Sequence, residues 1–154
     1  MNPFSVSDTD SEALNQAALF SWLSMVQAFG VAAANDPRSY TEAGHAKTVG
    51  FPQPDSVRND CELVHGIMNG LELKDARSGA AAKASGLRPG IPDIFVPIRR
   101  GSWSGLYIEL KTPKGTLRKS QEKMIPLLQA QGFMVKICIG WRQASVALLS
   151  YLLS

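Results

Sequence analysis

Gly90-Ile91-Pro92-Asp93-Ile94-Phe95-Val96 is the stretch that decides the fold, and Leu106-Tyr107-Ile108-Glu109-Leu110-Lys111 is its partner. Side chains on a β-strand alternate between its two faces. In the second segment the even-numbered apolar residues point into a core, and Glu109 and Lys111 share the opposite face. The apolar residues of the first segment leave Asp93 on that opposite face too. The two segments therefore predict paired strands with three ionisable groups on one side.

The connection between the two segments predicts a β-hairpin. Residues 99–105 read Arg-Arg-Gly-Ser-Trp-Ser-Gly, a polar stretch whose glycines suit a turn. Positions 93 and 109 are symmetric about Gly101. A simple antiparallel register therefore places the two carboxylates across from each other.

The two carboxylates predict a metal site. Held side by side they repel each other unless a cation lies between them, and hard oxygen ligands suit Mg²⁺ or Mn²⁺. Such a metal polarises a scissile phosphate and lowers the pKa of an attacking water, while Lys111 can orient that water or stabilise charge on the phosphorus. We expect a metal-dependent phosphodiesterase site at a solvent-facing edge of the hairpin. The alternative is an ordinary edge hairpin with solvated charges.

A second Pro-Asp…Glu-x-Lys set occurs earlier in the chain, at Pro54-Asp55 and Glu72-Leu73-Lys74. Residues 56–60 are too polar for a buried strand, and Glu72 lies between Asn69-Gly70 and a run of small residues. We assign this earlier set to loops, with Lys74 at most a phosphate contact.

Length and composition predict one domain over residues 1–154, since 154 residues with 45% hydrophobic content are enough for one compact core and short for two. There is no run of about 18 apolar residues to span a bilayer and no N-terminal signal pattern. We expect a cytoplasmic protein that does not interact with membranes. Cys61 and Cys138 fit no metal-binding spacing, and His45 and His65 are too far apart in sequence to predict a zinc pair.

Charge is unevenly distributed, although the net charge is only +3. Residues 1–73 carry nine acidic and three basic side chains, whereas residues 74–154 carry thirteen basic and four acidic ones. The basic half contains the candidate site, which favours an anionic polymer as the ligand over a scattered solvated surface. The predicted phosphate contacts are Arg99, Arg100, Lys114, Arg118 and Lys119.

Hydrophobic periodicity predicts the elements before the hairpin. Residues 11–29 form a helix capped by Ser11, with a wide apolar stripe that begins at Leu14. Residues 31–62 contain several Pro, Gly and polar residues and are predicted to be a long loop or insertion. Short strands are expected near 31–34 and 63–68, and a short alanine-rich helix near 78–85.

Beyond the hairpin, residues 117–131 predict a helix that contains Pro126. Residues 133–139 predict a strand that is parallel to its neighbour, because a helix separates the two. Residues 142–153 predict a closing helix with Val146, Leu149 and Leu152 facing inward. The fold class is α/β, a mixed β-sheet flanked by helices in three layers.

Several motifs occur in an order that resembles one nuclease family. They are Glu12 with Gln16, Asn69-Gly70, Gly86 before Gly90-x-Pro92-Asp93, Glu109-Leu110-Lys111-Thr112, Gly115 with Gln121, and Gly132-Phe133. Over nearly the whole chain this pattern resembles the VRR-NUC domain, a branch of the PD-(D/E)xK nucleases, in its stand-alone bacterial, phage or prophage type. The resemblance implies a restriction-endonuclease-like core. The chain departs from a minimal member in residues 35–63 and at Pro126.

By this resemblance, Asp93 and Glu109 are metal ligands for Mg²⁺ or Mn²⁺, with the Leu110 carbonyl as a further ligand. Lys111 is the catalytic lysine. Glu12 is an additional acidic, metal-linked catalytic residue, and Gln121 braces Lys111 or the phosphate. Without the resemblance, Glu12 merely favours a helix N-terminus and Gln121 is a surface residue.

The resemblance further implies a structure-selective DNA endonuclease that acts as a homodimer on branched DNA such as four-way (Holliday) junctions. Two alternatives stay open. One is a restriction-like or nicking endonuclease with a sequence preference, and the other is a DNA-binding module without catalysis. Intact Asp93, Glu109 and Lys111 argue against the second.

Overall fold

The computed structural model describes residues 1–50, 55–67 and 84–154. The chain begins with the 3₁₀ turn η1 and the long helix α1, continues through short helices to the sheet, and ends with α7. The described elements are η1 (Pro3–Ser5), α1 (Glu12–Phe29), α2 (Val31–Ala34), η2 (Pro37–Tyr40), α3 (His45–Val49), α4 (Asp55–Leu63), β1 (His65–Gly66), β2 (Ile94–Val96), β3 (Gly105–Lys111), α6 (Lys119–Ala130), β4 (Phe133–Ile139) and α7 (Gly140–Leu152).

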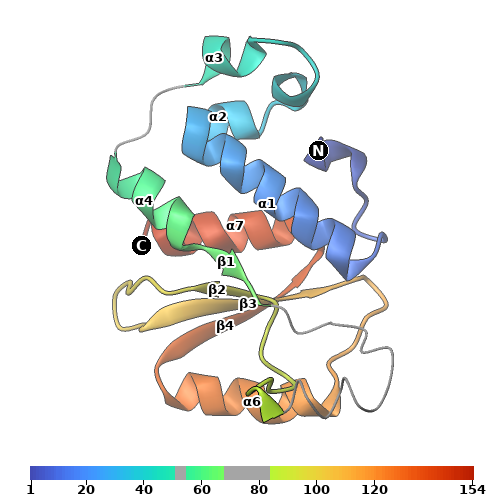
Figure 1. Cartoon of the computed structure of the whole chain (residues 1–154), viewed down its shortest axis with the longest axis vertical. Helices are drawn as coiled ribbons and strands as arrows, with labels where there is room; N and C mark the ends of the chain where they lie inside the picture. The colour runs from blue at the N-terminus through green and yellow to red at the C-terminus, as the bar shows by residue number, and fades with distance from the viewer. Residues whose placement is uncertain (51–54, 68–83) are drawn as a thin grey trace.

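Four strands form one mixed sheet in the order β1-β2-β3-β4 (Figure 1). β2 is antiparallel to both β1 and β3, whereas β3 and β4 are parallel, because α6 returns the chain between them. Ile94 pairs with Ile108 and Val96 with Leu106. The hairpin is therefore symmetric about residue 101, which confirms the predicted register.

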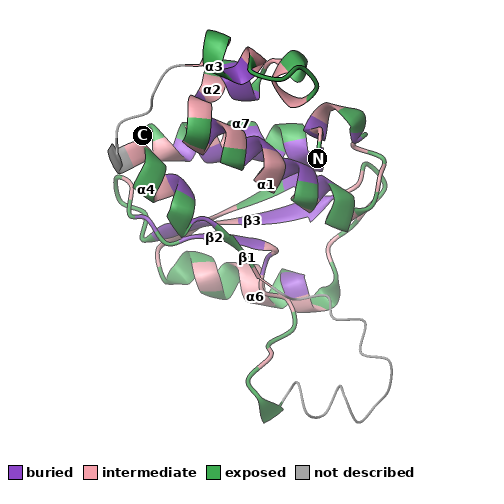
Figure 2. Ribbon diagram, turned by 45° about the horizontal axis from the view of Figure 1, so that its top comes forward, coloured by how far each residue is buried: buried purple, intermediate pink, exposed green. Residues whose placement is uncertain are grey.

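Helices cover both faces of the sheet and create three layers. α6 lies on one face, and α1 and α7 lie on the other (Figure 1). The main hydrophobic core fills the space between the sheet and α1 with α7, and it includes Ile94, Val96, Leu106 and Ile108, all fully buried on the strands (Figure 2). This arrangement confirms the predicted α/β class.

Helix α1 begins where the sequence predicts. The Ser11 hydroxyl accepts a hydrogen bond from the Leu14 amide at 3.2 Å and caps the helix. Ala18, Trp22 and Val26 recur at helical spacing and are buried. Leu14, the predicted start of the apolar stripe, is 44% exposed instead.

The segment after α1 is helical where a long loop was expected. α2, η2, α3 and α4 follow one another, and residues 31–34, an expected strand, form α2. α2 and α4 pack against α1. Such short helices are marginal alone and depend on tertiary packing, so their own sequences did not reveal them. Their packing also accounts for the wide apolar stripe of α1 within a single chain.

Helix α7 presents a face that agrees only in part with the predicted one. Leu149 and Leu152 are partly buried against the core, as predicted, but Val146 is 67% exposed, and Trp141, Leu148 and Tyr151 are the buried residues. The helix begins at Gly140 rather than near residue 142. The buried stripe therefore lies between the predicted positions and those one residue earlier, which differ by about 100° on a helix.

Part of the sequence reading falls on residues that the structure does not describe. The set Glu72-Leu73-Lys74 and almost all of the expected helix at 78–85 lie outside the described residues. Asp55 is the first residue of α4 rather than part of a loop. Within the described ranges, no helix combines the length and the apolar character needed to cross a membrane.

Candidate active site

Asp93 and Glu109 lie opposite each other at one end of the β2–β3 hairpin. Asp93 directly precedes β2, and continuing the observed register by one residue pairs it with Glu109 on β3. Asp93 Oδ2 accepts a hydrogen bond from the Leu110 amide at 2.8 Å. This bond holds the first acid against the strand that carries the second.

Glu109 is fully buried, which corrects the expectation of a solvent-facing edge. The sheet face that carries it is not open, because Gln121 of α6 covers it. Glu109 Oε1 accepts hydrogen bonds from Lys111 Nζ, at 2.5 Å, and from Gln121 Nε2. Glu109 Oε2 is buried and has no hydrogen-bond partner among the described residues. A buried carboxylate oxygen without a partner is costly, so it is a ready ligand for a cation.

Lys111 joins the sheet to α1. Besides Glu109, its Nζ donates to Glu12 Oε1 at 3.0 Å and to the Leu110 carbonyl at 3.1 Å. Burial lowers the pKa of Lys111, but the hydrogen bonds to the two glutamates outweigh this effect and leave the pKa above its ordinary value. Lys111 is therefore a buried, fixed cation.

Gln121 is hydrogen bonded to Glu109 and not to Lys111. Its Nε2 donates to Glu109 Oε1, and its Oε1 accepts a hydrogen bond from the Arg118 amide at 2.9 Å. The second bond satisfies a free amide at the start of α6. The Gln121 side chain thus caps the start of α6 and positions Glu109.

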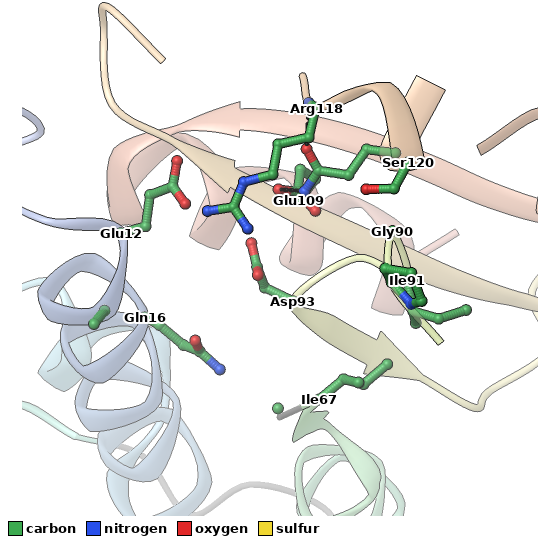
Figure 3. A pocket seen from close by; sticks show the side chains of 13 residues that line it. Glu12, Gln16, Ile67, Gly90, Ile91, Asp93, Glu109, Arg118 and Ser120 are labelled. Carbon is green, nitrogen blue, oxygen red and sulfur yellow. Dashed lines mark hydrogen bonds between the residues drawn. The ribbon is translucent and has the colours of Figure 1, made fainter. Parts of the chain in front are cut away.

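A cavity of about 570 Å³ opens beside these groups, between the start of α1, the end of β1 and the start of α6 (Figure 3). Asp93, Glu109 and Glu12 line it, together with Arg118 and Gln16. Figure 3 shows the Arg118 guanidinium in the space between the Glu12 and Asp93 carboxylates. The cavity therefore has an acidic floor with a basic side chain at its mouth.

Both acids of the hairpin resist ionisation in the protein alone. Burial raises the pKa of the Asp93 carboxyl, although the Leu110 amide and Lys111 oppose the change. Burial also raises the pKa of Glu109, against the hydrogen bond from Lys111. A cation between two such groups favours the carboxylate form of both.

The sequence pattern of the VRR-NUC domain matches residues 58–141, which is more than half of the chain and includes Asp93, Glu109, Lys111 and Gln121. The chain belongs to the VRR-NUC family. A solved structure named "VRR_NUC domain protein" has a TM-score of 0.60 to this chain at 18% sequence identity, and the match covers 94% of this chain and 89% of that chain. At this identity the likeness concerns the fold, and it agrees with a restriction-endonuclease-like core. A comparison with curated proteins gave no match. VRR-NUC domains are nuclease domains, so the expected class of substrate is DNA.

The residues of this VRR-NUC domain fit a hard divalent cation. Asp93 and Glu109 offer carboxylate oxygens, and Glu109 Oε2 has no hydrogen-bond partner in the part of the chain that the structure describes. The Leu110 carbonyl, which accepts a hydrogen bond from Lys111 Nζ, is a further oxygen ligand. Mg²⁺ usually binds one or two protein carboxylates and keeps several waters, so this donor set is sufficient. No cluster of three or more His, Cys, Asp or Glu side chains suited to a metal occurs in the described ranges.

The five predicted phosphate contacts separate into two groups. Arg118 lies in the cavity, and Lys114 and Lys119 are exposed on the connection from β3 into α6. Arg99 and Arg100 lie at the turn of the hairpin, roughly 20–23 Å along the strand from Asp93 at about 3.3 Å per residue. A hairpin therefore places these two residues, which are close to Asp93 in sequence, at the end of the hairpin that is farther from the site.

Arg100 has a structural role at that turn. Its guanidinium donates to the Leu152 carbonyl at 3.1 Å and forms an ion pair with Asp60. It therefore ties the hairpin turn to α7 and α4. Because these partners occupy the Arg100 guanidinium, we do not include Arg100 among the proposed phosphate contacts.

Two features of the site were not expected from the sequence. The sequence predicts Arg118 as a phosphate contact but not its position next to the acids. That position could not be predicted because residues 112–118 follow no periodic pattern. Gly90 has a φ of +94° and lies against the backbone of Ser120 and Gln121, where a Cβ would collide. The glycine two residues before Pro92 was the available signal for this close approach.

Proposed function

We propose that this domain is a metal-dependent, structure-selective endonuclease that hydrolyses phosphodiester bonds in branched DNA, such as flaps, forks or four-way junctions. The proposal depends above all on the buried Oε2 of Glu109 opposite Asp93, which finds no hydrogen-bond partner within residues 1–50, 55–67 and 84–154. A phosphate would be repelled by this acidic pair unless a cation lies between them. The nuclease family and the basic half of the chain support DNA as the ligand.

Asp93 and Glu109 would hold Mg²⁺ or Mn²⁺, with the Leu110 carbonyl as a further ligand and Glu12 linked to the site through Lys111. When bound, such an ion polarises the scissile phosphate and lowers the pKa of a coordinated water. The pocket of buried acids then becomes neutral or positive toward DNA.

The remaining side chains hold the geometry. Glu12 and Glu109 hold Lys111 from two elements, so its ammonium is a positive charge fixed beside the acids, where it stabilises negative charge that develops on the phosphate. Gln121 occupies Glu109 Oε1, which leaves Oε2 as the ligand oxygen. Arg118 at the mouth of the cavity supplies the first positive contact for a phosphate.

A homodimer is part of the proposal, since symmetric cleavage of two strands needs two active sites at a fixed spacing. The apolar stripe of α1 does not support it, because α2, α4 and α7 cover that helix within the chain. Support comes from the edge strand β4, where Ile137 is 47% exposed, and from Leu127 on α6, which is 61% exposed. Open sheet edges with apolar residues invite a partner.

The decisive experiment is a panel of labelled linear, flap, fork and four-way DNA substrates with Mg²⁺, Mn²⁺ or EDTA. The proposal expects cleavage that needs the metal and prefers the branched substrates. Cleavage of linear DNA at one sequence would favour the restriction-like or nicking alternative, and binding without cleavage in either metal would favour a non-catalytic module. Light scattering at micromolar concentration tests the dimer. A monomer that cuts only single flaps would refute the dimer and leave the nuclease chemistry standing.

A further inference from the structure

Four aromatic side chains continue the candidate site along the sheet. Phe95 on β2 pairs with Tyr107 on β3, and their rings stack with centroids 4.4 Å apart at an angle of 17°. His65 on β1 meets Phe95 edge-on at 5.7 Å. Phe133 on β4 meets Phe95 at 5.8 Å and Tyr107 at 5.4 Å, also edge-on. We call His65, Phe95, Tyr107 and Phe133 the aromatic row.

The aromatic row is separate from the main core. It lies on the sheet face opposite to the fully buried Ile94 and Ile108, the face on which α6 packs against β4 (Figure 1). Its members are not fully buried: His65 is exposed and the three other rings are half-buried. Gly105 lies against this row and the neighbouring strand, because a Cβ at this position would come within 2.8 Å of the Val96 carbonyl, 3.1 Å of the Phe95 ring and 3.2 Å of the Phe133 ring. A glycine therefore occupies the position on β3 where the Phe95 and Phe133 rings approach the backbone.

The aromatic row lies beside the acidic pair. Phe95 follows Asp93 by two residues and Tyr107 precedes Glu109 by two, so both pairs occupy one face of the same hairpin at successive levels. Two strand residues span about 7 Å, and two nucleotides of one DNA strand advance by about the same distance at ~3.4 Å each. A phosphate held at the acids brings a neighbouring base within reach of the rings.

We propose that the aromatic row stacks an unpaired base of the DNA next to the scissile phosphate. This inference rests on the proposed nuclease function and names the feature of the substrate that the site selects, namely single-stranded nucleotides at a flap, a fork or an opened junction. Aromatic side chains stack on the face of any base, so this contact is tolerant of sequence. A base inside a duplex is already stacked and cannot lie on the rings.

The charges around the aromatic row favour nucleic acid as its occupant. Lys111 and Arg118 lie at the acidic end of the hairpin, and Lys114 is exposed on the loop that follows. Base stacking combined with basic side chains that follow the backbone is the usual arrangement for single-stranded DNA. A second copy of this chain, docked on the same rings, is the other occupant that the experiment distinguishes.

The test measures DNA binding with Ca²⁺ in place of Mg²⁺, under conditions where no cleavage is detected, so that a cation holds the phosphate at the acids and the result does not depend on cleavage. One probe is a duplex with a single-stranded arm, and the other is a fully paired duplex of the same length. Phe95→Leu and Tyr107→Leu should weaken binding of the armed probe by about five- to a hundredfold and leave binding of the paired duplex unchanged. Tyr107→Phe keeps the ring and should bind like the wild type. Trp103→Leu, at the far end of the same hairpin, is the matched control and should change neither affinity.

A second readout needs no variant. A 2-aminopurine base placed in the arm should lose fluorescence when the wild-type protein binds, because stacking quenches it. Unchanged fluorescence, unchanged affinity of both leucine variants, or an equal loss for both probes would each overturn the stacking role. Leucine variants that alter the oligomeric state but not DNA affinity would assign the rings to a protein contact. A wild-type protein that binds neither probe would overturn the proposed nuclease function itself, so the two failures are distinct.

Discussion

The Asp93 carboxylate is hydrogen bonded to the backbone amide of Leu110, across the hairpin and one residue beyond its last strand pairs. The bond makes the acid that precedes β2 part of the same rigid unit as Glu109 on β3. It also decides how the site should be probed. Asn at position 93 keeps an acceptor for the Leu110 amide, whereas Ala leaves that amide without a partner and mixes a folding effect with the chemical one.

Asp93→Asn and Glu109→Gln should each lower Mg²⁺-dependent cleavage by at least about 100-fold and leave the protein folded. Lys111→Ala should abolish cleavage as well. Mg²⁺ should raise the unfolding temperature of the wild type but not that of the two acid variants, since an ion that binds only the folded state stabilises it by mass action. Thermal unfolding with and without Mg²⁺ measures this independently of activity.

Two controls accompany these variants. Glu122→Gln changes an exposed acid on α6, and Glu72→Ala changes the earlier Pro-Asp…Glu-x-Lys set of the sequence. Both should cleave like the wild type. Near-normal cleavage by Glu109→Gln, or a loss with Glu72→Ala, would remove the site assignment.

Arg100→Ala should lower the free energy of unfolding by about 2 kcal/mol, because it removes a charged donor from Asp60 and from the Leu152 carbonyl. It should leave the salt dependence of DNA binding unchanged. Urea unfolding measures the first effect, with the exposed neighbour Arg99→Ala as the control. A stable Arg100→Ala protein with weakened DNA binding would show instead that Arg100, at the hairpin turn, contacts DNA phosphates.

Arg118→Ala should weaken DNA binding for all sequences and reduce the slope of log Kd against log salt by about one, as expected for one lost phosphate contact. Lys114→Ala and Lys119→Ala should add to this effect. Binding titrations at several salt concentrations test it. Lys47 on α3 lies on the other side of the molecule from α6 (Figure 1), so Lys47→Ala should not change the slope. An equal effect of Lys47→Ala would contradict a DNA-binding surface confined to the side of α6.

Asn15→Ala should destabilise the fold by about 3 kcal/mol or more, since it strands several buried polar groups. The buried Asn15 amide donates to the carbonyls of Ser7, Asp10 and Ser11, and its Oδ1 accepts from the Trp141 amide at 3.0 Å. It thereby joins the start of α1 to the start of α7. Urea unfolding measures the loss of stability, with Asn59→Ala at an exposed position as the control. Equal stabilities of the two variants would show that the Asn15 hydrogen bonds are not needed for the fold.

The cysteine thiols should react slowly in the native protein. Burial raises the pKa of Cys138 to about 11 and also raises that of Cys61. A raised pKa stabilises the fold below the ordinary thiol pKa, and that contribution is lost as pH rises from there through about 11. Iodoacetamide labelling at pH 8 should be slow without urea and fast with it, and unfolding in urea should become easier above pH 9. Rapid labelling of the native protein would contradict the burial of both thiols.

The hairpin and its acids could be predicted because they depend on neighbouring residues only. Alternation of apolar side chains assigns each residue of a strand to a face, and the turn at Gly101 sets which residues meet. The parallel pairing of β3 with β4 follows from the helix between them for the same reason. Asp93, Glu109 and Lys111 were therefore placed together before any tertiary contact was known.

The tertiary structure alone decided which of these groups are buried and what they touch. Docking of α6 buried Glu109 and brought Gln121 to it. Packing on α1 accompanies the helices α2 and α4 in a segment that was expected to be a loop, and burial of Trp141 and Leu148 turned α7 partly away from its predicted face. The same folding carried Arg100 into an ion pair and Arg118 into the cavity. Periodicity and turn symmetry are properties of consecutive residues and are written in the sequence, whereas burial and ion pairing depend on which distant segments meet.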